Sequence, residues 1–345
     1  MIVVRGKVIV VLALLLAATT LLGLASCGGA DPEGIVTVVQ IAPAGMEDAL
    51  AAGEIDAFLA WEPFPAKAVA AGTGHYLVQS GEIWPDHPCC ILAVSQEGAD
   101  ARTEEALLWV HAKATRFLVA QARQEEVLDY GVELASEPRA IVSEALSHMS
   151  FSPTDPLPGL RKIAEDLKGL GLLPSDTGEA FWRGFGRTDR LAAVSERLQA
   201  DPTWVPAAGP GELRLGYIAK DLHQLALYVG VKERLFEKVG LVPGRNLSLR
   251  PYPNGVAIMQ AFSAGELDAA YLGAVPALLK SVNDRVPIAV VAGANQEGSA
   301  LVTKAGIDRV EDLAGLRVAV PQVGTVQYVL LLVLLERHGL KFRLG

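Results

Sequence analysis

The sequence predicts an α/β protein of two lobes, each a mostly parallel β-sheet flanked by helices, with a helical tail on one lobe. Two observations carry this prediction. A short segment occurs twice, as Ala-Gly-Glu-Ile-Asp-Ala at residues 52–57 and as Ala-Gly-Glu-Leu-Asp-Ala at residues 264–269. Around both copies, apolar runs of strand length alternate with helical runs, which is the rhythm of α/β folds.

Both copies of the repeat stand in the same frame. A strand-like run (36–41 and 247–252) is followed by a Pro/Gly break, a helical run, the repeated segment and a second apolar run. This order predicts a β-α-β unit in each half. Two copies so far apart, with unlike sequence between them, indicate two similar lobes rather than a solenoid. The repeated residues themselves are expected to end a helix and to begin a strand.

The first residues predict an export signal that lies outside the fold. Arg5 and Lys7 precede the uncharged run 8–24, which closes on Leu24-Ala25-Ser26-Cys27. This ending resembles a bacterial lipobox and implies cleavage before Cys27, with lipid on its sulfur. An uncleaved transmembrane anchor is the alternative. In both cases the body of the protein faces the outside of a cell membrane.

Composition excludes several classes of protein. The 345 residues are 51% hydrophobic, enough for one large or two modest cores. The net charge is −9 and no basic run occurs after the signal, so a nucleic-acid partner is excluded. Besides Cys27 the chain has only Cys89 and Cys90, which excludes a disulfide framework.

The chain divides into three zones. Short apolar runs alternate with helices over residues 36–94, the region 103–198 is strongly helical, and 201–211 is a Pro/Gly linker. A second α/β zone follows the linker. Its predicted strands are 213–218, 247–251, 269–272, 288–292, 300–303 and 317–320.

Four segments carry a family resemblance. They are Leu-Arg-Leu-Gly-Tyr-Ile-Ala from residue 213, the segment 264–278 around the second repeat, Val-Glu-Asp-Leu-Ala-Gly-Leu-Arg-Val-Ala-Val-Pro from residue 310 with Gly-Thr at 324–325, and Asp-Ala-Phe-Leu-Ala-Trp-Glu-Pro from residue 56. They resemble the nitrate/sulfonate/taurine class of ABC-transporter substrate-binding proteins, over nearly the whole chain after the signal.

The resemblance implies a periplasmic-binding-protein fold of the venus-flytrap type. It implies a monomeric, lipid-anchored receptor at the outer face of the cytoplasmic membrane or in the periplasm, with no cofactor, no metal and no chemistry of its own. Such a receptor captures a small anionic or zwitterionic solute between its lobes and delivers it to an ABC permease.

The ligand site is expected where strands end and helices begin, because helix N-termini present unpaired N–H groups there. Taken alone, each of these turns reads as an ordinary turn or helix cap. The expected ligand-binding residues after the linker are Ala219, His223, Gly273, Ala274, Gly298, Ser299, Gly324 and Thr325. Ser299 and Thr325 are expected to donate hydrogen bonds from their hydroxyl and backbone groups.

Trp61 and Glu62 are the expected counterparts in the first repeat. The Trp61 ring is expected to form a wall against the solute. A carboxylate at Glu62 would repel a doubly charged oxyanion and favour a ligand with an amine or ring nitrogen. This argues for an aminosulfonate or a heterocyclic vitamin precursor over nitrate and simple sulfonates.

His87, Cys89 and Cys90 form an unusual local group. The first interpretation is a buried structural pair of cysteines. Adjacent residues on a strand point to opposite faces, which argues against a metal site that needs converging ligands. The second is that His87 or Cys89 contacts the ligand. Metal binding or catalysis ranks last, and it supplies the rival function: an enzyme on the same fold, of lyase or sulfinate-cleaving type, that uses Cys89 and His87. A sensor domain would need a transmembrane helix and a cytoplasmic module, and none follows residue 27.

The order of the segments departs from the resemblance, in which the part after the linker comes first. This predicts a circularly permuted chain, with one lobe formed by residues 35–80 and 306–345 and the other by 85–305. The helix predicted at 327–338 is expected to feed no further strand, and the run 35–40 is expected to take that place beside 317–320. There are two alternatives. One is a gene-assembly error, and the other is a pair of half-proteins that complete each other by swapping between chains.

Overall fold

The computed structural model describes residues 34–152, 155–174, 177–207 and 209–345. The predicted export signal and the lipid-attachment residue Cys27 lie outside these described residues. Among the helices that the structure describes, none combines the length and the apolar character needed to cross a membrane.

Two six-stranded sheets form the framework. Sheet A has the order β12-β1-β11-β2-β10-β3 and sheet B the order β5-β9-β4-β8-β6-β7. The strands of sheet A are β1 (Val36–Gln40), β2 (Ala57–Trp61), β3 (His75–Gln79), β10 (Ser299–Thr303), β11 (Arg317–Val320) and β12 (Phe342–Leu344). Those of sheet B are β4 (Pro88–Ser95), β5 (Met149–Ser150), β6 (Leu213–Ile218), β7 (Leu247–Tyr252), β8 (Ala269–Gly273) and β9 (Ile288–Glu297).

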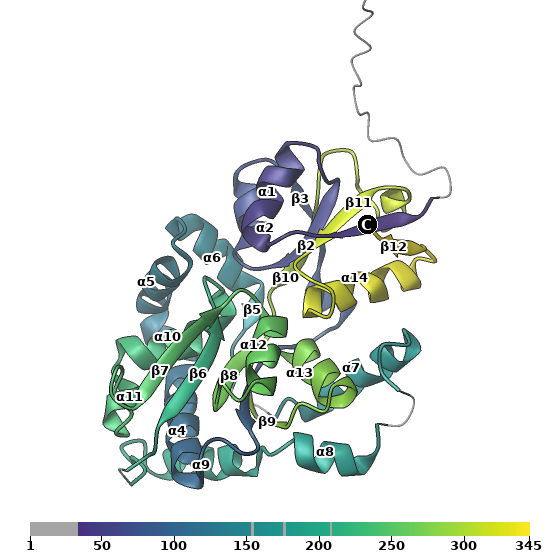
Figure 1. The fold of residues 1–345 in the computed structure, drawn as a ribbon. Coiled ribbons are helices and arrows are strands. Elements are labelled where there is room, and N and C mark those ends of the chain that lie inside the picture. The colour runs from purple at the N-terminus through teal and green to yellow at the C-terminus, as the bar shows by residue number, and fades with distance from the viewer. Residues whose placement is uncertain (1–33, 153–154, 175–176, 208) are drawn as a thin grey trace, which may run out of the picture.

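Sheet A is built from both ends of the described chain. Strand β1 pairs in parallel with β11, with Thr37 opposite Arg317 and Gln40 opposite Val320. This confirms the expectation that the run 35–40 lies beside 317–320, within one chain. Figure 1 shows the result: purple and yellow segments share the upper part of the molecule, and the middle of the chain forms the lower part. We call these parts unit A (35–83 and 299–345) and unit B (88–297).

The two sheets repeat one arrangement. Strands β1, β11 and β2 are parallel, and β10 and β3 follow with alternating direction. Strands β7, β6 and β8 are likewise parallel, and β4 and β9 follow with alternating direction. The antiparallel strand of each sheet, β10 or β4, is supplied by a chain segment arriving from the other unit. Sheet B therefore contains both parallel and antiparallel strand pairs, whereas a mostly parallel sheet was expected.

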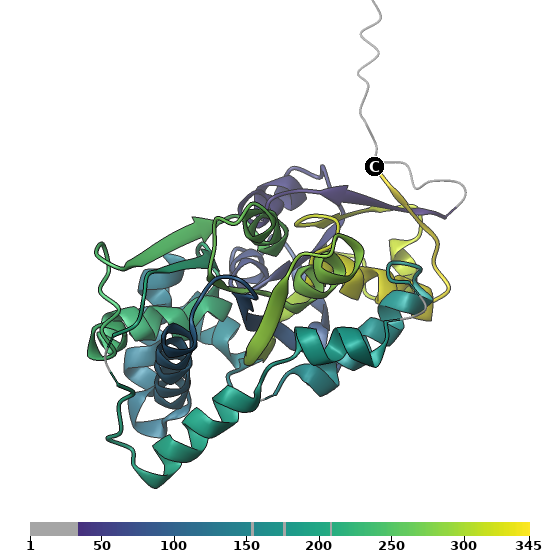
Figure 2. The same ribbon diagram turned by 60° about the horizontal axis from the view of Figure 1, so that its bottom comes forward.

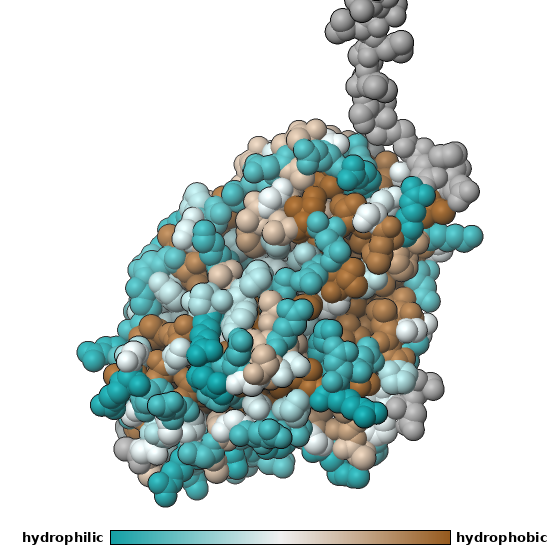
Figure 3. All heavy atoms as spheres, in the orientation of Figure 1, coloured by the Kyte–Doolittle hydropathy of each residue, from teal (hydrophilic) through white to brown (hydrophobic). Residues whose placement is uncertain are grey.

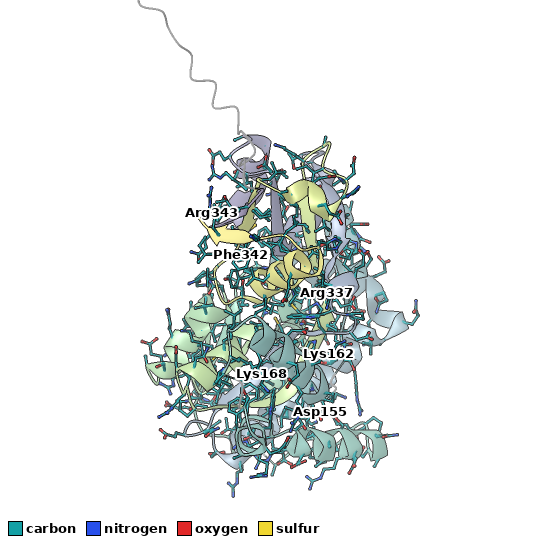
Figure 4. All side chains as sticks on the ribbon, turned by 90° about the vertical axis from the view of Figure 1, so that its right-hand side faces the viewer. Asp155, Lys162, Lys168, Arg337, Phe342 and Arg343 are labelled. Carbon is teal, nitrogen blue, oxygen red and sulfur yellow. The ribbon has the colours of Figure 1, made fainter. Side chains whose placement is uncertain are left out.

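Two boundary expectations need correction. Strand β10 was expected within the 85–305 part, yet it pairs with β2 and β3 in sheet A. A strand also does follow the last long helix: β12 pairs in parallel with the outer side of β1. All three residues of β12 are exposed, so no buried apolar face signals it in the sequence. Figure 4 labels Phe342 and Arg343 on this edge strand, above Arg337.

Helices cover both sheets. Unit A carries α1 (Pro43–Ala51), α2 (Phe64–Ala70), α3 (Ser80–Ile83), η3 (Val310–Leu313) and α14 (Val326–Arg337). The helical region of unit B comprises α4 (Ala101–Val119), η1 (Gln121–Arg123), α5 (Gln124–Ala135), α6 (Arg139–Ser147), α7 (Leu157–Gly169), α8 (Glu179–Phe185) and α9 (Asp189–Ala200). Its remaining helices are η2 (Leu222–Gln224), α10 (Leu225–Lys232), α11 (Leu235–Lys238), α12 (Gly255–Ser263) and α13 (Ala274–Asn283). Figure 2 shows α7 to α9 along one side of the molecule.

The repeated segment has the same structural role in both units. Gly53 and Gly265 have positive φ of 71° and 68° and end α1 and α12, a conformation that costs glycine little. The aspartate that follows, Asp56 or Asp268, accepts a backbone N–H at the start of the neighbouring strand, at 2.9 Å from Arg317 of β11 and 2.8 Å from Arg214 of β6. The repeat therefore ends a helix and leads into a strand, as predicted, and its aspartate also aligns two parallel strands.

One apolar core continues from unit A into unit B. Helix α14 is buried from Val326 to Leu335, as a helix that is apolar on all sides should be. It packs against α13, and residues of both helices belong to the same core cluster. In Figure 3 hydrophobic residues gather on the side of unit A around α14.

Candidate functional site: a closed cavity between the two units

A small cavity lies where the carboxyl ends of the central strands of both sheets meet. Its volume is about 20 Å³, which is room for about one water molecule. Unit A contributes Trp61, Thr325, Val326 and Gln327; unit B contributes Cys89, Cys90, Ile218, Asp221, His223, Gly255, Gly273 and Pro276. The two units are therefore closed over this site.

Three helices begin at the cavity wall. Gly255 is the first residue of α12, Gly273 is the N-cap of α13, and Thr325 is the N-cap of α14. The first N–H groups of a helix have no partner inside the helix and carry a partial positive charge. Their convergence makes one end of the cavity suited to an acidic group.

Two chain segments cross between the units beside the cavity. One leads from β3 through α3 to β4, and the other from β9 to β10. They are tied together by backbone and side-chain hydrogen bonds, including Glu297 N–H to the His87 carbonyl at 3.1 Å and Ser299 N–H to Ser80 Oγ at 3.2 Å. A pair of adjacent crossing segments is the geometry of a hinge.

An acid–imidazole–thiol cluster forms the unit B wall. Asp221 Oδ1 lies 2.7 Å from His223 Nδ1, and His223 Nε2 lies 2.8 Å from the Glu297 carbonyl. Because both ring nitrogens face acceptors, both are expected to carry protons. Burial lowers the pKa of His223, but the charges of Cys89 and Asp221 outweigh burial and raise it well above its ordinary value.

Cys89 and Cys90 point into the same cavity, contrary to the expectation that they face opposite sides of the strand. The register between β4 and β9 slips from Pro88 opposite Gln296 to Cys90 opposite Asn295, which leaves Cys89 as the extra residue of a bulge. A hydrogen bond from the Cys90 thiol, together with the His223 charge, lowers the pKa of Cys89 well below its ordinary value. The same hydrogen bond and burial raise the pKa of Cys90.

His87 is buried but does not line the cavity. Neither of its ring nitrogens has a hydrogen-bond partner, and burial lowers the pKa of the ring. The predicted partnership of Cys89 with His87 is therefore replaced by Cys89 with His223. The separation of 134 positions between Cys89 and His223 hid this pairing from sequence reasoning.

Trp61 supplies the wall of unit A, as expected. Its ring is 5% exposed, and its indole Nε1 is buried without a hydrogen-bond partner although the residue lines the cavity. A buried donor without a partner is unfavourable unless something else satisfies it. The unit A wall thus offers one neutral donor.

The two predicted hydroxyl donors are already engaged. Thr325 Oγ1 donates to the Gln322 carbonyl at 2.7 Å and accepts from Tyr328 N–H, so it caps α14. Ser299 Oγ accepts from Gln327 Nε2 at 2.9 Å, and Ser299 does not line the cavity. Thr325 keeps its place in the wall, but as the residue that fixes the start of α14.

Glu62 lies beside the hinge rather than in the cavity. Its carboxylate is fully buried, accepts from Ala66 N–H at 3.0 Å and contacts His148 Nδ1 at 2.7 Å. Burial lowers the pKa of His148, but Glu62 outweighs this effect and raises it above the ordinary value. Glu62, an expected ligand-binding residue, therefore does not line this cavity.

Of the other predicted residues, His223 and Gly273 line the cavity. Ala219, Ala274, Gly298 and Gly324 do not. The lining residues that sequence reasoning missed are Cys90, Ile218, Asp221, Gly255, Pro276, Val326 and Gln327. Asp221 is the N-cap of η2 and was recognisable as a cap, but nothing local marked it as part of a site.

A larger hollow on the described surface lies elsewhere. It measures about 470 Å³ and is lined by residues around Leu213 and Leu247, at the amino ends of β6 and β7. The carboxyl end of a strand and the N-terminus of a long helix are both missing from its lining. It therefore lacks the unpaired N–H groups that the cavity between the units presents. Within the described part of the chain, no group of three or more His, Cys, Asp or Glu side chains is placed to hold a metal ion.

A family model described as NMT1-like matches residues 20–130 and 207–343, together more than half of the chain. The chain is 37% identical over 100 residues to a taurine-binding periplasmic protein of Escherichia coli, covering 28% of this chain and 31% of that protein. It is 24% identical over 160 residues to the bicarbonate-binding protein CmpA of a Synechococcus strain, covering 46% and 33%. The aligned part is thus about a third of either relative.

A third relative is the nitrate import ATP-binding protein NrtC of Synechocystis, 29% identical over 105 residues that cover 30% of this chain and 16% of NrtC. Among solved structures, the Escherichia coli murein tripeptide binding protein MppA overlaps with a TM-score of 0.32 at 12% identity, covering 78% of this chain and 54% of that one. The sequence matches agree with the family resemblance drawn from the sequence.

Proposed function

The chain belongs to the NMT1-like family, and we propose that it is a receptor that captures one small anionic or zwitterionic solute between units A and B and delivers it to an ABC permease. One observation carries the proposal: a buried cavity is lined by the strand ends and helix starts of both units. Ligands of open α/β sheets bind at such strand ends. The taurine-binding and bicarbonate-binding names of the relatives point to the same class of solute.

The charges at the cavity favour a zwitterion over a simple anion. The starts of α12, α13 and α14 and the Trp61 N–H would hold an acidic group. Asp221, the Cys89 sulfur and His223 line the same cavity from unit B, and the single imidazolium of His223 faces two negative groups there. A positively charged amine on the solute would balance the remaining negative charge on that side of the cavity. A small aminosulfonate or amino acid of similar length has both groups.

Binding requires the units to separate and close again. A cavity of about 20 Å³ admits about one water molecule, so a solute of several heavy atoms enters only when the hinge opens. The two adjacent crossing segments provide that hinge, and the paired contacts between units, such as Glu62 with His148, favour the closed form. We therefore propose the described conformation as the closed state.

The proposed activity is binding without turnover. The rival enzyme would need a base or acid free to exchange a proton with Cys89, but both His223 nitrogens face other acceptors. His87 is outside the lining. Two of the three relatives named above are a taurine-binding and a bicarbonate-binding protein, which agrees with this proposal.

We also place the receptor outside the cytoplasmic membrane, held by lipid on Cys27, and monomeric. The support is the sequence Leu24-Ala25-Ser26-Cys27 behind a charge-free run, together with the periplasmic relative.

The order of the chain is proposed to be a circular permutation. Its support is the place of β1, which sits where β7 sits in unit B but comes from the other end of the chain.

A thermal-shift screen tests the receptor function. Reduced protein is titrated with taurine, nitrate, bicarbonate and small amino acids, with choline as a solute of the wrong charge. A solute present at a hundred times its Kd adds about 2.7 kcal/mol to the free energy of unfolding. We expect a saturable rise for at least one acid and none for choline. A flat response to the whole panel, or an equal response to choline, would contradict the proposal.

A further inference from the structure

We propose that Cys89 and Cys90 form a redox-active dithiol inside the solute cavity, in which Cys89 attacks small disulfides and Cys90 completes the exchange. The proposal rests on the proposed opening of the units, because the cavity as described admits about one water molecule; the reaction itself needs no bound solute. Both sulfurs line one cavity, because the bulge at Cys89 turns its side chain to the side of Cys90. Both thiols are free in this structure.

The surroundings of Cys89 favour its thiolate. His223 is held by Asp221 and by the Glu297 carbonyl, so its ring can carry two protons and a positive charge next to the Cys89 sulfur. The Cys90 thiol donates to the same sulfur. Burial lowers the pKa of the nearby His87, although the charges of Cys89 and of Glu297 on β9 act in the opposite direction. A thiolate next to an imidazolium is the arrangement found in reactive cysteines.

The reaction balances without a cofactor. The Cys89 thiolate attacks one sulfur of a disulfide RS–SR, which forms a Cys89–S–SR bond and releases RS⁻; this ion takes a proton from water. Cys90 then gives its proton to the solvent and its thiolate attacks the Cys89 sulfur, which expels the second RS⁻. The two protein thiols lose two electrons and two protons, and the disulfide becomes two thiols.

The product is expected to be labile. Adjacent Cα atoms are about 3.8 Å apart, closer than the roughly 4.4 to 6.8 Å usual for a disulfide, and such strain makes a disulfide easier to reduce. The pair would therefore respond to the redox state of its surroundings and change the polarity of the cavity wall. Oxidation also removes the Cys89 thiolate that faces His223.

Mass spectrometry of the folded protein treated with 2-hydroxyethyl disulfide tests the proposal. Wild type should lose two hydrogen atoms and carry no adduct, and dithiothreitol should reverse the change. The Cys90→Ser variant should accumulate the mixed disulfide, because its resolving thiol is gone. The Cys89→Ser variant should remain unmodified while folded but react at Cys90 in urea, which shows that the reagent works.

The pH dependence separates this site from an ordinary buried thiol. Between pH 8 and pH 6 the alkylation rate of Cys89 by iodoacetamide should fall less than about threefold, whereas a thiol with an ordinary pKa near 8.5 loses roughly 80-fold. Asp221→Asn, checked for native circular dichroism, should restore a steep pH dependence. An unreactive folded wild type, equal modification of Cys89→Ser, or a steep profile in wild type would each overturn the proposal. Calorimetry on reduced protein reports solute binding separately.

Discussion

Asp268 connects the turn of the second repeat to the neighbouring strand β6. Its contacts explain the structural role of the repeated segment. Its carboxylate accepts Arg214 N–H at 2.8 Å and binds the Arg214 guanidinium at 2.7 and 3.0 Å. Asp56 accepts Arg317 N–H in the same way in unit A. The repeat was recognisable in the sequence because this strand-aligning contact requires an aspartate at one fixed position after the helix.

The Asp268→Asn variant should therefore lose stability. The amide keeps the shape of the side chain but loses the charge, and hydrogen bonds to a charged group contribute about 1.5 to 3 kcal/mol. Urea unfolding should show a loss in that range. The matched control is Glu266→Gln in the same turn, whose side chain is exposed; it should change the free energy of unfolding by less than about 0.5 kcal/mol. Equal losses in the two variants would contradict this role.

Gly298 is the residue where the hinge passes closest to the site. Its φ is 78°, and a Cβ placed there would lie 2.4 Å from His223 Nε2. The Gly298→Ala variant should lose stability both from the left-handed backbone, about 1 to 2 kcal/mol, and from the displaced His223 ring. Gly306 has a similar φ of 86° with nothing within 4 Å, so Gly306→Ala isolates the backbone effect. A Tm loss no larger in Gly298→Ala than in Gly306→Ala would contradict the close approach.

At the scale of elements, the end of β2 is held to the helical region of unit B. Glu62, just after β2, contacts His148 at the end of α6 at 2.7 Å, and Glu144 lies 3.3 Å from the other ring nitrogen. Tyr76 of β3 packs edge-on against the same imidazole at 5.0 Å. The contact joins unit A to unit B and therefore belongs to the closed form.

This contact should make stability depend on pH. The folded-state pKa of His148 is raised, so its contribution is fully present below the ordinary value of about 6.5 and is lost as pH rises through the raised folded pKa. The Tm difference between wild type and Glu62→Gln should therefore shrink as pH rises from 6 to 9. The control Glu144→Gln removes the more exposed partner and should show a smaller change. A difference that grows with pH would have the wrong sign.

The elements show why some parts of this fold could be predicted and others could not. Strands such as Ala269–Gly273 are continuous apolar runs, and the helix ends are marked by glycines, so both are encoded locally. Strand β12 is exposed throughout and lacks that signal. The bulge that turns Cys89 into the cavity depends on pairing with β9 some two hundred residues away. Site residues followed the same division: the strand ends were predicted, and the partners brought from elsewhere were not.

At the scale of the whole molecule, the proposed permutation concerns the path of the chain in unit B compared with that in unit A. In unit B the chain runs from β6 through α10 and α11 to β7. In unit A the equivalent path from β11 through α14 meets β1, whose Val36 N–H donates to the Lys341 carbonyl at 2.9 Å. The two chain segments thus already touch where a continuous chain would join them.

A reconnected chain tests the permutation. Joining Lys341 through one or two glycines to Gly34, deleting 342–345, and opening the chain within the 201–211 linker should give a folded monomer with the same circular dichroism and solute affinity. The control is deletion of 342–345 alone, which removes only exposed residues and should change Tm little. Aggregation of the reconnected chain while the deletion control stays folded would contradict the equivalence of the two orders.

The central claim is that one solute is held between the units, and a calorimetric titration of the Gly273→Trp variant tests it most directly. A Cβ at Gly273 would lie 3.3 Å from Pro276 of its own unit and 3.3 Å from Val326 of the other, so a Trp side chain there fills the cavity and holds the units apart. Wild type should bind the best solute of the screen with a stoichiometry of one, and Gly273→Trp, still unfolding cooperatively, should bind none. Unchanged affinity in Gly273→Trp, or a stoichiometry other than one in wild type, would contradict the account.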